Sequence, residues 1–121
     1  MTRILYVDDE DDIREVAVMA LELDPGFEVR ACESGAELLD LAPDWLPDLI
    51  LLDVMMPRMD GPTAFARLRQ QPGTAAIPVV FITARTQSRE VEALKQLGAR
   101  GVIAKPFDPI ALAAQVRGYL E

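Results

Sequence analysis

Carboxylates follow two apolar segments of this sequence, each at the point where the segment ends. Asp8 and Asp9 come directly after residues 4–7, and Asp53 comes directly after residues 49–52. A buried, isolated charge is so unfavourable that such a side chain is normally paired or bound to a metal. Carboxylates that converge repel one another, and a hard cation such as Mg²⁺ relieves that repulsion. The pattern therefore predicts a reactive or metal-binding site built from aspartates.

Two further apolar segments end in a polar side chain. Thr83 follows residues 77–82, and Lys105 follows residues 102–104. Threonine is favoured in strands and lysine at solvated surfaces, so each residue alone has an ordinary structural explanation. Beside a cluster of acids, however, Lys105 becomes a partner for a phosphate or a carboxylate.

The acidic run that begins at Asp8 has an alternative explanation as the solvated start of a helix, where negative charge is favourable. We expect that role for Asp11 and Asp12. We expect Asp8 and Asp9 to belong to the site instead, because Asp53 ends a neighbouring strand. The run lacks the ligand spacing and the glycine of a helix–loop–helix calcium site.

Composition narrows the classes of function. The chain has 121 residues, of which 50% are hydrophobic, and a formal charge of −8. These values are typical of one globular domain, residues 1–121, and the negative charge argues against direct nucleic-acid binding or a membrane surface. No apolar stretch approaches the ~20 residues that a membrane span requires.

The numbers of histidine and cysteine residues exclude further kinds of site. Histidine is absent, which excludes His-containing zinc sites and Ser-His-Asp triads, so a phosphohistidine that this protein meets must belong to a partner. Cys32 is the only cysteine. No internal disulfide can form, and we expect a reducing, cytoplasmic setting.

Strand-like and helix-like segments alternate along the chain. We expect strands at residues 3–7, 27–32, 48–52, 77–82 and 100–104, with a helix after each one. Apolar stripes predict buried faces on the first, fourth and fifth helices: Ile13, Val16, Ala17, Ala20 and Leu21; Val91, Leu94 and Leu97; Leu112, Val116 and Leu120.

Turn and capping residues agree with this division. Ser34 and Glu37 predict a capping box at the second helix, and Gly61-Pro62 predicts the start of the third. Leu97-Gly98 predicts the end of the fourth helix, and Asp108-Pro109 predicts an N-cap for the fifth.

Alternating strands and helices of these lengths predict an α/β fold, a three-layer doubly wound parallel sheet of five strands. The common strand order is 2-1-3-4-5, and ligands bind at the carboxyl ends of strands 1 and 3. Asp8, Asp9 and Asp53 end those two strands. We therefore expect the topology to bring them together.

Taken in order, five short motifs resemble a response-regulator receiver domain. They are Val7-Asp8-Asp9, Leu52-Asp53-Val54-Met55-Met56-Pro57, Met59-Asp60-Gly61, Ile82-Thr83-Ala84 and Ala104-Lys105-Pro106-Phe107. Each motif alone is weak, but their order and their positions at strand ends make the joint signal specific. The resemblance covers essentially the whole chain and implies a flavodoxin-like domain of two-component or phosphorelay signalling.

The resemblance implies a role for each acid. Asp53 would be the phosphoacceptor and a Mg²⁺ ligand, and Asp9 would bind Mg²⁺ directly. Asp8 would act nearby, often through a metal-bound water, and Met55 would supply a backbone carbonyl ligand. The domain would catalyse only its own phosphorylation and dephosphorylation.

The resemblance also implies how the signal leaves the site. Thr83 would hydrogen-bond a phosphoryl oxygen, and Lys105 would pair first with Asp53 and then with the phosphate. The Lys105–Pro106 peptide is expected to be cis. Many family members carry Tyr or Phe three positions before the lysine, where this chain has Val102. We therefore expect the switch to run mainly through Thr83 and residues 85–88.

Partners follow from the same resemblance. A sensor histidine kinase or a histidine phosphotransfer protein would supply the phosphoryl group. The output protein or domain would contact the face formed by the fourth helix, the fifth strand and the fifth helix. That face also pairs two copies in a homodimer in many family members.

Two other functions compete with this interpretation. Haloacid-dehalogenase-type phosphohydrolases also use an aspartate nucleophile, but they place a second Asp two residues later, where this chain has Met55, and they need a substrate-covering cap. A receiver fold that serves only as an interaction module usually lacks an acid or the lysine. This chain has the full set.

Overall fold

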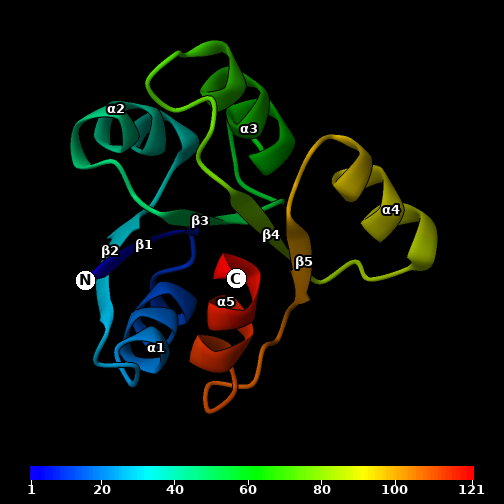
Figure 1. Ribbon diagram of the computed structural model, residues 1–121. Helices are drawn as coiled ribbons and strands as arrows, with labels where there is room; N and C mark the ends of the chain where they lie inside the picture. Colours follow the sequence, from blue (N-terminus) through cyan, green and yellow to red (C-terminus); the bar gives the residue numbers. More distant parts are fainter.

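The computed structural model describes residues 1–121 as a parallel sheet of five strands between two layers of helices (Figure 1). The elements are β1 (Thr2–Val7), α1 (Asp11–Leu21), β2 (Phe27–Cys32), α2 (Gly35–Trp45), β3 (Leu49–Asp53), α3 (Gly61–Gln70), β4 (Val79–Thr83), α4 (Ser88–Gln96), β5 (Gly101–Ala104) and α5 (Leu112–Leu120). The strand order is β2-β1-β3-β4-β5, and neighbouring strands run parallel. The predicted class, layers and strand order are confirmed.

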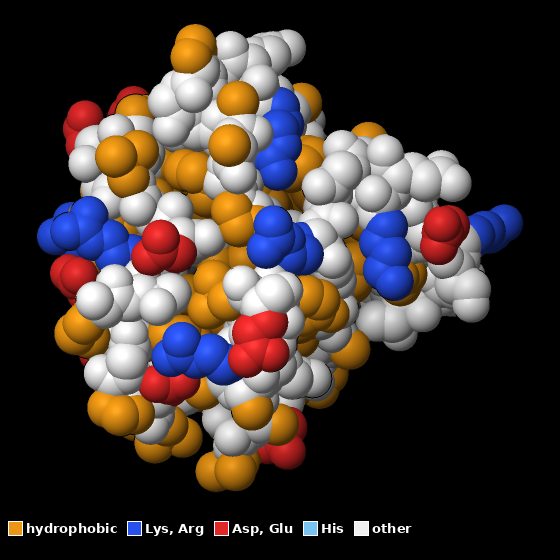
Figure 2. Space-filling view, in the orientation of Figure 1, with side chains coloured by type: hydrophobic (Ala, Val, Ile, Leu, Met, Phe, Trp, Pro, Cys, Tyr) orange, Lys and Arg blue, Asp and Glu red, His pale blue; other side chains and the backbone are white.

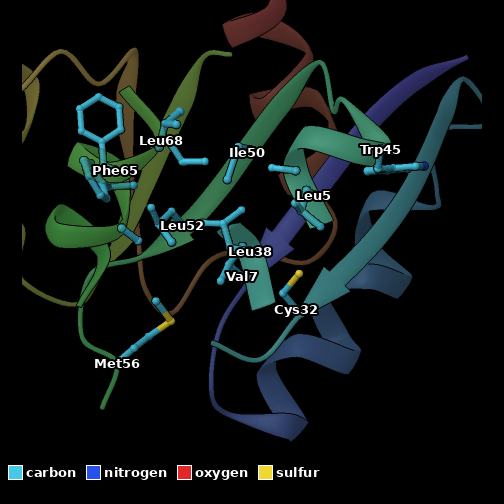
Figure 3. Close-up of a cluster of buried hydrophobic side chains, with 14 of the residues drawn as sticks. Leu5, Val7, Cys32, Leu38, Trp45, Ile50, Leu52, Met56, Phe65 and Leu68 are labelled. Carbon is cyan, nitrogen blue, oxygen red and sulfur yellow. The ribbon is translucent and has the colours of Figure 1, made fainter. Parts of the chain in front are cut away.

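Alternate residues of the central strands enter two separate cores. One core lies between the sheet and α2, α3 and α4, and its strand members include Leu5, Val7, Ile50 and Leu52 (Figure 3). The other lies between the sheet and α1 and α5, and its strand members include Ile4, Tyr6, Leu49 and Leu51. Because both faces of the sheet are covered, β1 and β3 are apolar on both sides rather than alternating with polar residues.

Two strands end one residue later than the sequence predicts. β3 includes Asp53 and β4 includes Thr83, so both polar residues belong to the ladder itself. β4 also begins later than predicted, at Val79, because Pro78 has no N–H to donate and contributes only its carbonyl, to the N–H of Ile50. The apolar pattern alone does not predict the last residues of β3 and β4 or the first residue of β4.

The predicted helix faces are only partly buried. In α1, Ala17, Ala20 and Leu21 are buried, whereas Val16 is 43% exposed. The buried side of α1 is formed by Ala17, Ala20 and Leu21, and Val16 lies outside it. α4 buries only one of its three predicted residues, because it covers the end of the sheet beside β5.

Most capping predictions are confirmed. Ser34 Oγ accepts from the N–H of Glu37 at 3.1 Å, although the return bond of a full capping box is not formed. Asp60 accepts from the N–H of Thr63 and caps α3, which begins at Gly61-Pro62. α4 ends at Leu97-Gly98, and Gly98 has a φ of +111°, the left-handed conformation that glycine adopts without strain.

The predicted cap of α5 is wrong. Asp108 accepts from the N–H of Ile110 at 2.9 Å within a turn, and the helix begins only at Leu112 with Ala111 as its N-cap. A local turn between Asp108 and Ala111 uses the capping group before the helix starts.

The surface is mixed in charge. On the face shown in Figure 2, basic and acidic side chains lie among apolar ones and do not form a continuous basic area. None of the helices combines the length and hydrophobicity that crossing a bilayer demands.

Gly61 lets the loop after β3 pack closely against the end of β3. Its N–H donates to the carbonyl of Val54 at 2.9 Å, and a Cβ at this position would overlap the backbone of Asp53. Any side chain here would push the start of α3 away from the end of β3. The loop that carries Met55 is therefore held close to Asp53 by the absence of a side chain.

We predict that Gly61→Ala lowers the free energy of unfolding by about 1–3 kcal/mol, the usual cost of overpacking. Urea unfolding measures this change. Gly73→Ala is the matched control, because a Cβ at Gly73 would meet nothing within 4 Å. Equal stability of Gly61→Ala and the wild-type protein would show that the loop tolerates a wider path.

Candidate functional site

Asp8, Asp9 and Asp53 meet at the carboxyl edge of the sheet. β1 lies beside β3 with Val7 opposite Leu52, so the residues that follow are neighbours. One carboxylate oxygen from each of the three aspartates lies within 4.8 Å of the others. Asp8 is fully buried and Asp53 is 4% exposed, while Asp9 faces solvent. The prediction that topology brings these acids together is confirmed.

Lys105 enters this cluster from the end of β5. Its Nζ lies 3.0 Å from Asp8 Oδ2, 3.4 Å from Asp53 Oδ2 and 3.3 Å from Glu10 Oε1. The lysine thus contacts Asp53, as the sequence predicts, but its shortest contact is with Asp8. One ammonium group thus forms ion pairs with three carboxylates, two of which are buried.

The Asp8 carboxylate is held on both oxygens. Tyr6 donates its hydroxyl to Oδ2 at 3.0 Å, and the N–H of Glu10 donates to Oδ1 at 3.0 Å. Neither Tyr6 nor Glu10 is among the site residues predicted from the sequence. A signal for Tyr6 existed, since residues two apart on a strand point to the same side and Tyr6 carries the only polar group in its apolar segment.

Burial and charge alter the proton affinities in the cluster. Burial raises the pKa of Asp53 to about 6, the negative charge of Asp8 adds to this effect, and Lys105 opposes it. Burial alone would lower the pKa of Lys105, but its bond to Asp8 and the charge of Asp53 outweigh that effect and raise it. Burial, followed by the charge of Asp8, raises the pKa of Tyr6, so its hydroxyl remains a donor.

Thr83 and Met55 flank the cluster. Thr83 is 2% exposed at the end of β4, where its Oγ1 accepts from the N–H of Arg85 at 3.0 Å. Asp53 pairs with Ile82 in the sheet, so Thr83 lies one residue beyond it on the neighbouring strand. The side chain of Met55 is 60% exposed and lines, together with Thr83, a groove of about 330 Å³.

The donor set fits Mg²⁺. This cation is usually held by one or two carboxylates and keeps several waters. Asp8 already accepts hydrogen bonds on both oxygens, whereas Asp9 faces solvent beside Asp53. Asp9 and Asp53 are therefore the carboxylates best placed to contact a cation, with Asp8 behind them.

Comparison with known proteins decides the family. The family model described as "Response regulator receiver domain" matches residues 4–117. The chain belongs to the response regulator receiver family. Domains of this family are phosphoacceptor switches of two-component systems, in which an aspartate is phosphorylated.

Curated relatives cover the whole receiver. The transcriptional regulatory protein CseB of Streptomyces coelicolor is 39% identical over 98% of this chain and 49% of its own length. The phosphate regulon transcriptional regulatory protein PhoB of Pseudomonas aeruginosa is 37% identical over 97% of this chain and 51% of its own length. The chain spans about half the length of the curated relatives that it matches.

Solved receiver structures agree over nearly the full length. The chemotaxis response regulator CheY4 of Vibrio cholerae has a TM-score of 0.89 at 32% identity and covers 98% of both chains. A response regulator from Desulfuromonas acetoxidans has a TM-score of 0.89 at 31% identity, with coverage of 99% of this chain and 97% of its own. The Lys105–Pro106 peptide of this receiver is cis, as the sequence resemblance implies.

Val102, where the resemblance implies an aromatic residue in many receivers, lies partly buried on β5. The aromatic ring beside this strand comes from α5 instead. Tyr119 lies so close to Gly101 that a Cβ there would overlap the ring, and its hydroxyl lies 3.4 Å from the carbonyl of Val102. β5 is therefore flanked by an aromatic residue that it does not itself carry.

We predict that Asp53→Asn stabilises the metal-free protein at about pH 8 by on the order of 2 kcal/mol, because charged Asp53 is buried beside Asp8. The folded-state pKa is raised, so the stability that protonation provides is full below the unfolded value of about 3.9 and is lost as pH rises through about 6. The advantage of the variant should disappear near pH 4.

Urea unfolding at several pH values, with a chelator present, measures this difference. Asp44→Asn is the control, since Asp44 is an exposed carboxylate on α2. An Asp53→Asn protein that is less stable than the wild type at neutral pH would contradict the assigned cost of burying Asp53.

Proposed function

We propose that this receiver accepts a phosphoryl group on Asp53 from a partner phosphohistidine, in a Mg²⁺-dependent reaction, and thereby switches its output face. The single observation that carries the proposal is the position of the Lys105 ammonium between Asp8 and Asp53 at the ends of adjacent strands. A buried carboxylate with a counter-charge beside it can gain a phosphoryl group without leaving a charge unpaired.

The reaction requires Asp53 to act as the nucleophile. One of its carboxylate oxygens attacks phosphorus in line, the P–N bond of the partner phosphohistidine breaks, and an acyl phosphate forms on Asp53. Such transfers depend on positioning and on neutralising the equatorial oxygens. Mg²⁺, when bound by Asp9, Asp53 and the carbonyl of Met55, would supply part of that neutralisation.

Lys105 and Thr83 supply the remainder and start the switch. The lysine would leave Glu10 and contact a phosphoryl oxygen, since a phosphoryl group carries nearly two negative charges. The hydroxyl of Thr83 would turn from the N–H of Arg85 to another phosphoryl oxygen, and the loop after β4 would follow. The domain would turn over only its own phosphoryl group.

A groove beside Lys105 suits the phosphodonor. It holds about 220 Å³ between α1 and the loop after β5, and Val16 and Phe107 line it together with Lys105. Ile110, 81% exposed, lies in the same loop. A helical histidine kinase or histidine phosphotransfer protein could pack an apolar face there and present its phosphohistidine to Asp53, in the cytoplasm.

The output partner would contact α4, β5 and α5. Val102 and Tyr119 line a groove of about 370 Å³ on this face, along the strand that precedes Lys105. An output protein or domain, or a second receiver, would bind there after phosphorylation. Half of the length of the transcriptional relatives lies outside the matched segment, which is consistent with a separate output domain in those proteins.

We predict that incubation with Mg²⁺ and a small acyl-phosphate donor adds one phosphoryl group to the protein. Intact-mass spectrometry measures the adduct, and chelation of Mg²⁺ should abolish it. Asp53→Asn should form none, whereas Asp44→Asn should behave as the wild type. An adduct that persists in folded Asp53→Asn protein would refute the assignment of the acceptor.

We predict that Lys105→Ala, with Mg²⁺ present to offset the buried acids, remains folded but uncouples phosphorylation from the output face. Amide NMR shifts across α4, β5 and α5 should then change little when the phosphoryl group is added. Lys95→Ala is the matched control, because Lys95 is an exposed lysine of α4. Shift changes equal to those of the wild type would show that Lys105 does not transmit the signal.

A further inference from the structure

The Tyr6 hydroxyl is the one buried polar group at the site that the proposed reaction does not use. Tyr6 is fully buried in the middle of β1, and its hydroxyl donates to Asp8 Oδ2 at 3.0 Å. Lys105 Nζ contacts the same oxygen at 3.0 Å. A phenol and an ammonium group thus converge on one atom beside Asp53.

The phenol has little freedom to move. Its ring belongs to the core under α1 and α5 and meets the ring of Phe107 edge to face, with centroids 6.5 Å apart. β1 pairs with β2 on one side and β3 on the other. These contacts fix the position of the Tyr6 hydroxyl. The Asp8 carboxylate, which accepts a hydrogen bond from it, is therefore held in place as well.

The hydrogen bond has an electrostatic consequence as well. Asp8 and Asp53 are both buried and repel each other, and Lys105 is shared between them. A hydrogen bond from the Tyr6 hydroxyl offsets part of the cost of burying the charge of Asp8. The hydroxyl therefore holds the buried Asp8 carboxylate in one orientation beside Lys105 and Asp53.

We propose that Tyr6 is a positioning residue of this site: its hydroxyl fixes the Asp8 carboxylate, so that Asp8 holds Lys105 beside Asp53 and faces the bound cation in one orientation. The inference rests on the proposed function, since it concerns the same Mg²⁺ and phosphoryl site. It assigns to β1 a role in that site beyond carrying the aspartates.

Tyr6→Phe removes the hydroxyl and retains the ring that packs against Phe107. Groups that orient metal ligands from behind typically change metal affinity by about 10–100-fold. Because Asp8 lies behind the direct ligands, we expect the lower end, roughly tenfold weaker Mg²⁺ binding. The initial rate of phosphorylation by a small acyl phosphate at low Mg²⁺ should fall in proportion and recover at saturating Mg²⁺.

Isothermal titration of Mg²⁺ into the intact chain tests the proposal, with Tyr119→Phe as the matched control. Tyr119 also loses a single hydroxyl, one that lies beside the carbonyl of Val102 away from the acids. The decisive comparison uses Asp8→Ala as a second background. If Tyr6 acts through Asp8, Tyr6→Phe should weaken Mg²⁺ binding in the wild-type protein and change it less than about twofold in Asp8→Ala.

Unchanged affinity in Tyr6→Phe, or an equal loss in both backgrounds, overturns the positioning role. A loss of the same size in Tyr119→Phe does so too, because it would reflect general loosening of the domain. Mg²⁺ binding without an Asp53 adduct refutes the proposed function and leaves the Tyr6 comparison valid. Absence of Mg²⁺ binding by the wild-type protein overturns both.

Discussion

The ammonium group of Lys105 holds the reactive edge of this domain together. It lies between Asp8 and Asp53, two buried carboxylates that repel each other, and offsets part of their charge, and it also contacts Glu10 at the solvent boundary. Ion pairs in the interior gain little net stability, yet removing one partner leaves a charge that the interior cannot solvate. The ends of β1, β3 and β5 must therefore keep the relative positions that allow Asp8 and Asp53 to contact the Nζ of Lys105.

This shared contact divides the site into a fixed part and a reactive part. Asp8 accepts hydrogen bonds from the hydroxyl of Tyr6 and the N–H of Glu10. It is therefore a fixed partner for Lys105. Asp53 has a raised pKa of about 6 and only part of one counter-charge, so it gains from a cation or a phosphoryl group that recruits Lys105 fully. A new charge at Asp53 can redirect the lysine without dismantling the cluster, which is the physical basis of a reversible switch.

The sequence predicted the fold and most of the site, for reasons that the structure makes clear. Strand ends marked by Asp8, Asp53 and Lys105 become neighbours through topology, and topology follows from the alternation of strands and helices. The misses concern contacts that no spacing encodes. The exposure of Val16 depends on which side of α1 packs against its neighbours, and the start of α5 depends on a local turn. The contact between Tyr6 and Asp8 depends on where one hydroxyl points.

A crystal structure with Mg²⁺ and beryllofluoride bound would show directly whether Lys105 moves when Asp53 is modified, because the fluoride complex imitates the phosphoryl group on an aspartate. We predict that Lys105 Nζ leaves Glu10 and lies within hydrogen-bond distance of a fluorine atom on Asp53, while Asp8 still accepts from Tyr6. A beryllofluoride complex of Asp53 in which Lys105 remains between Asp8 and Glu10 would contradict it.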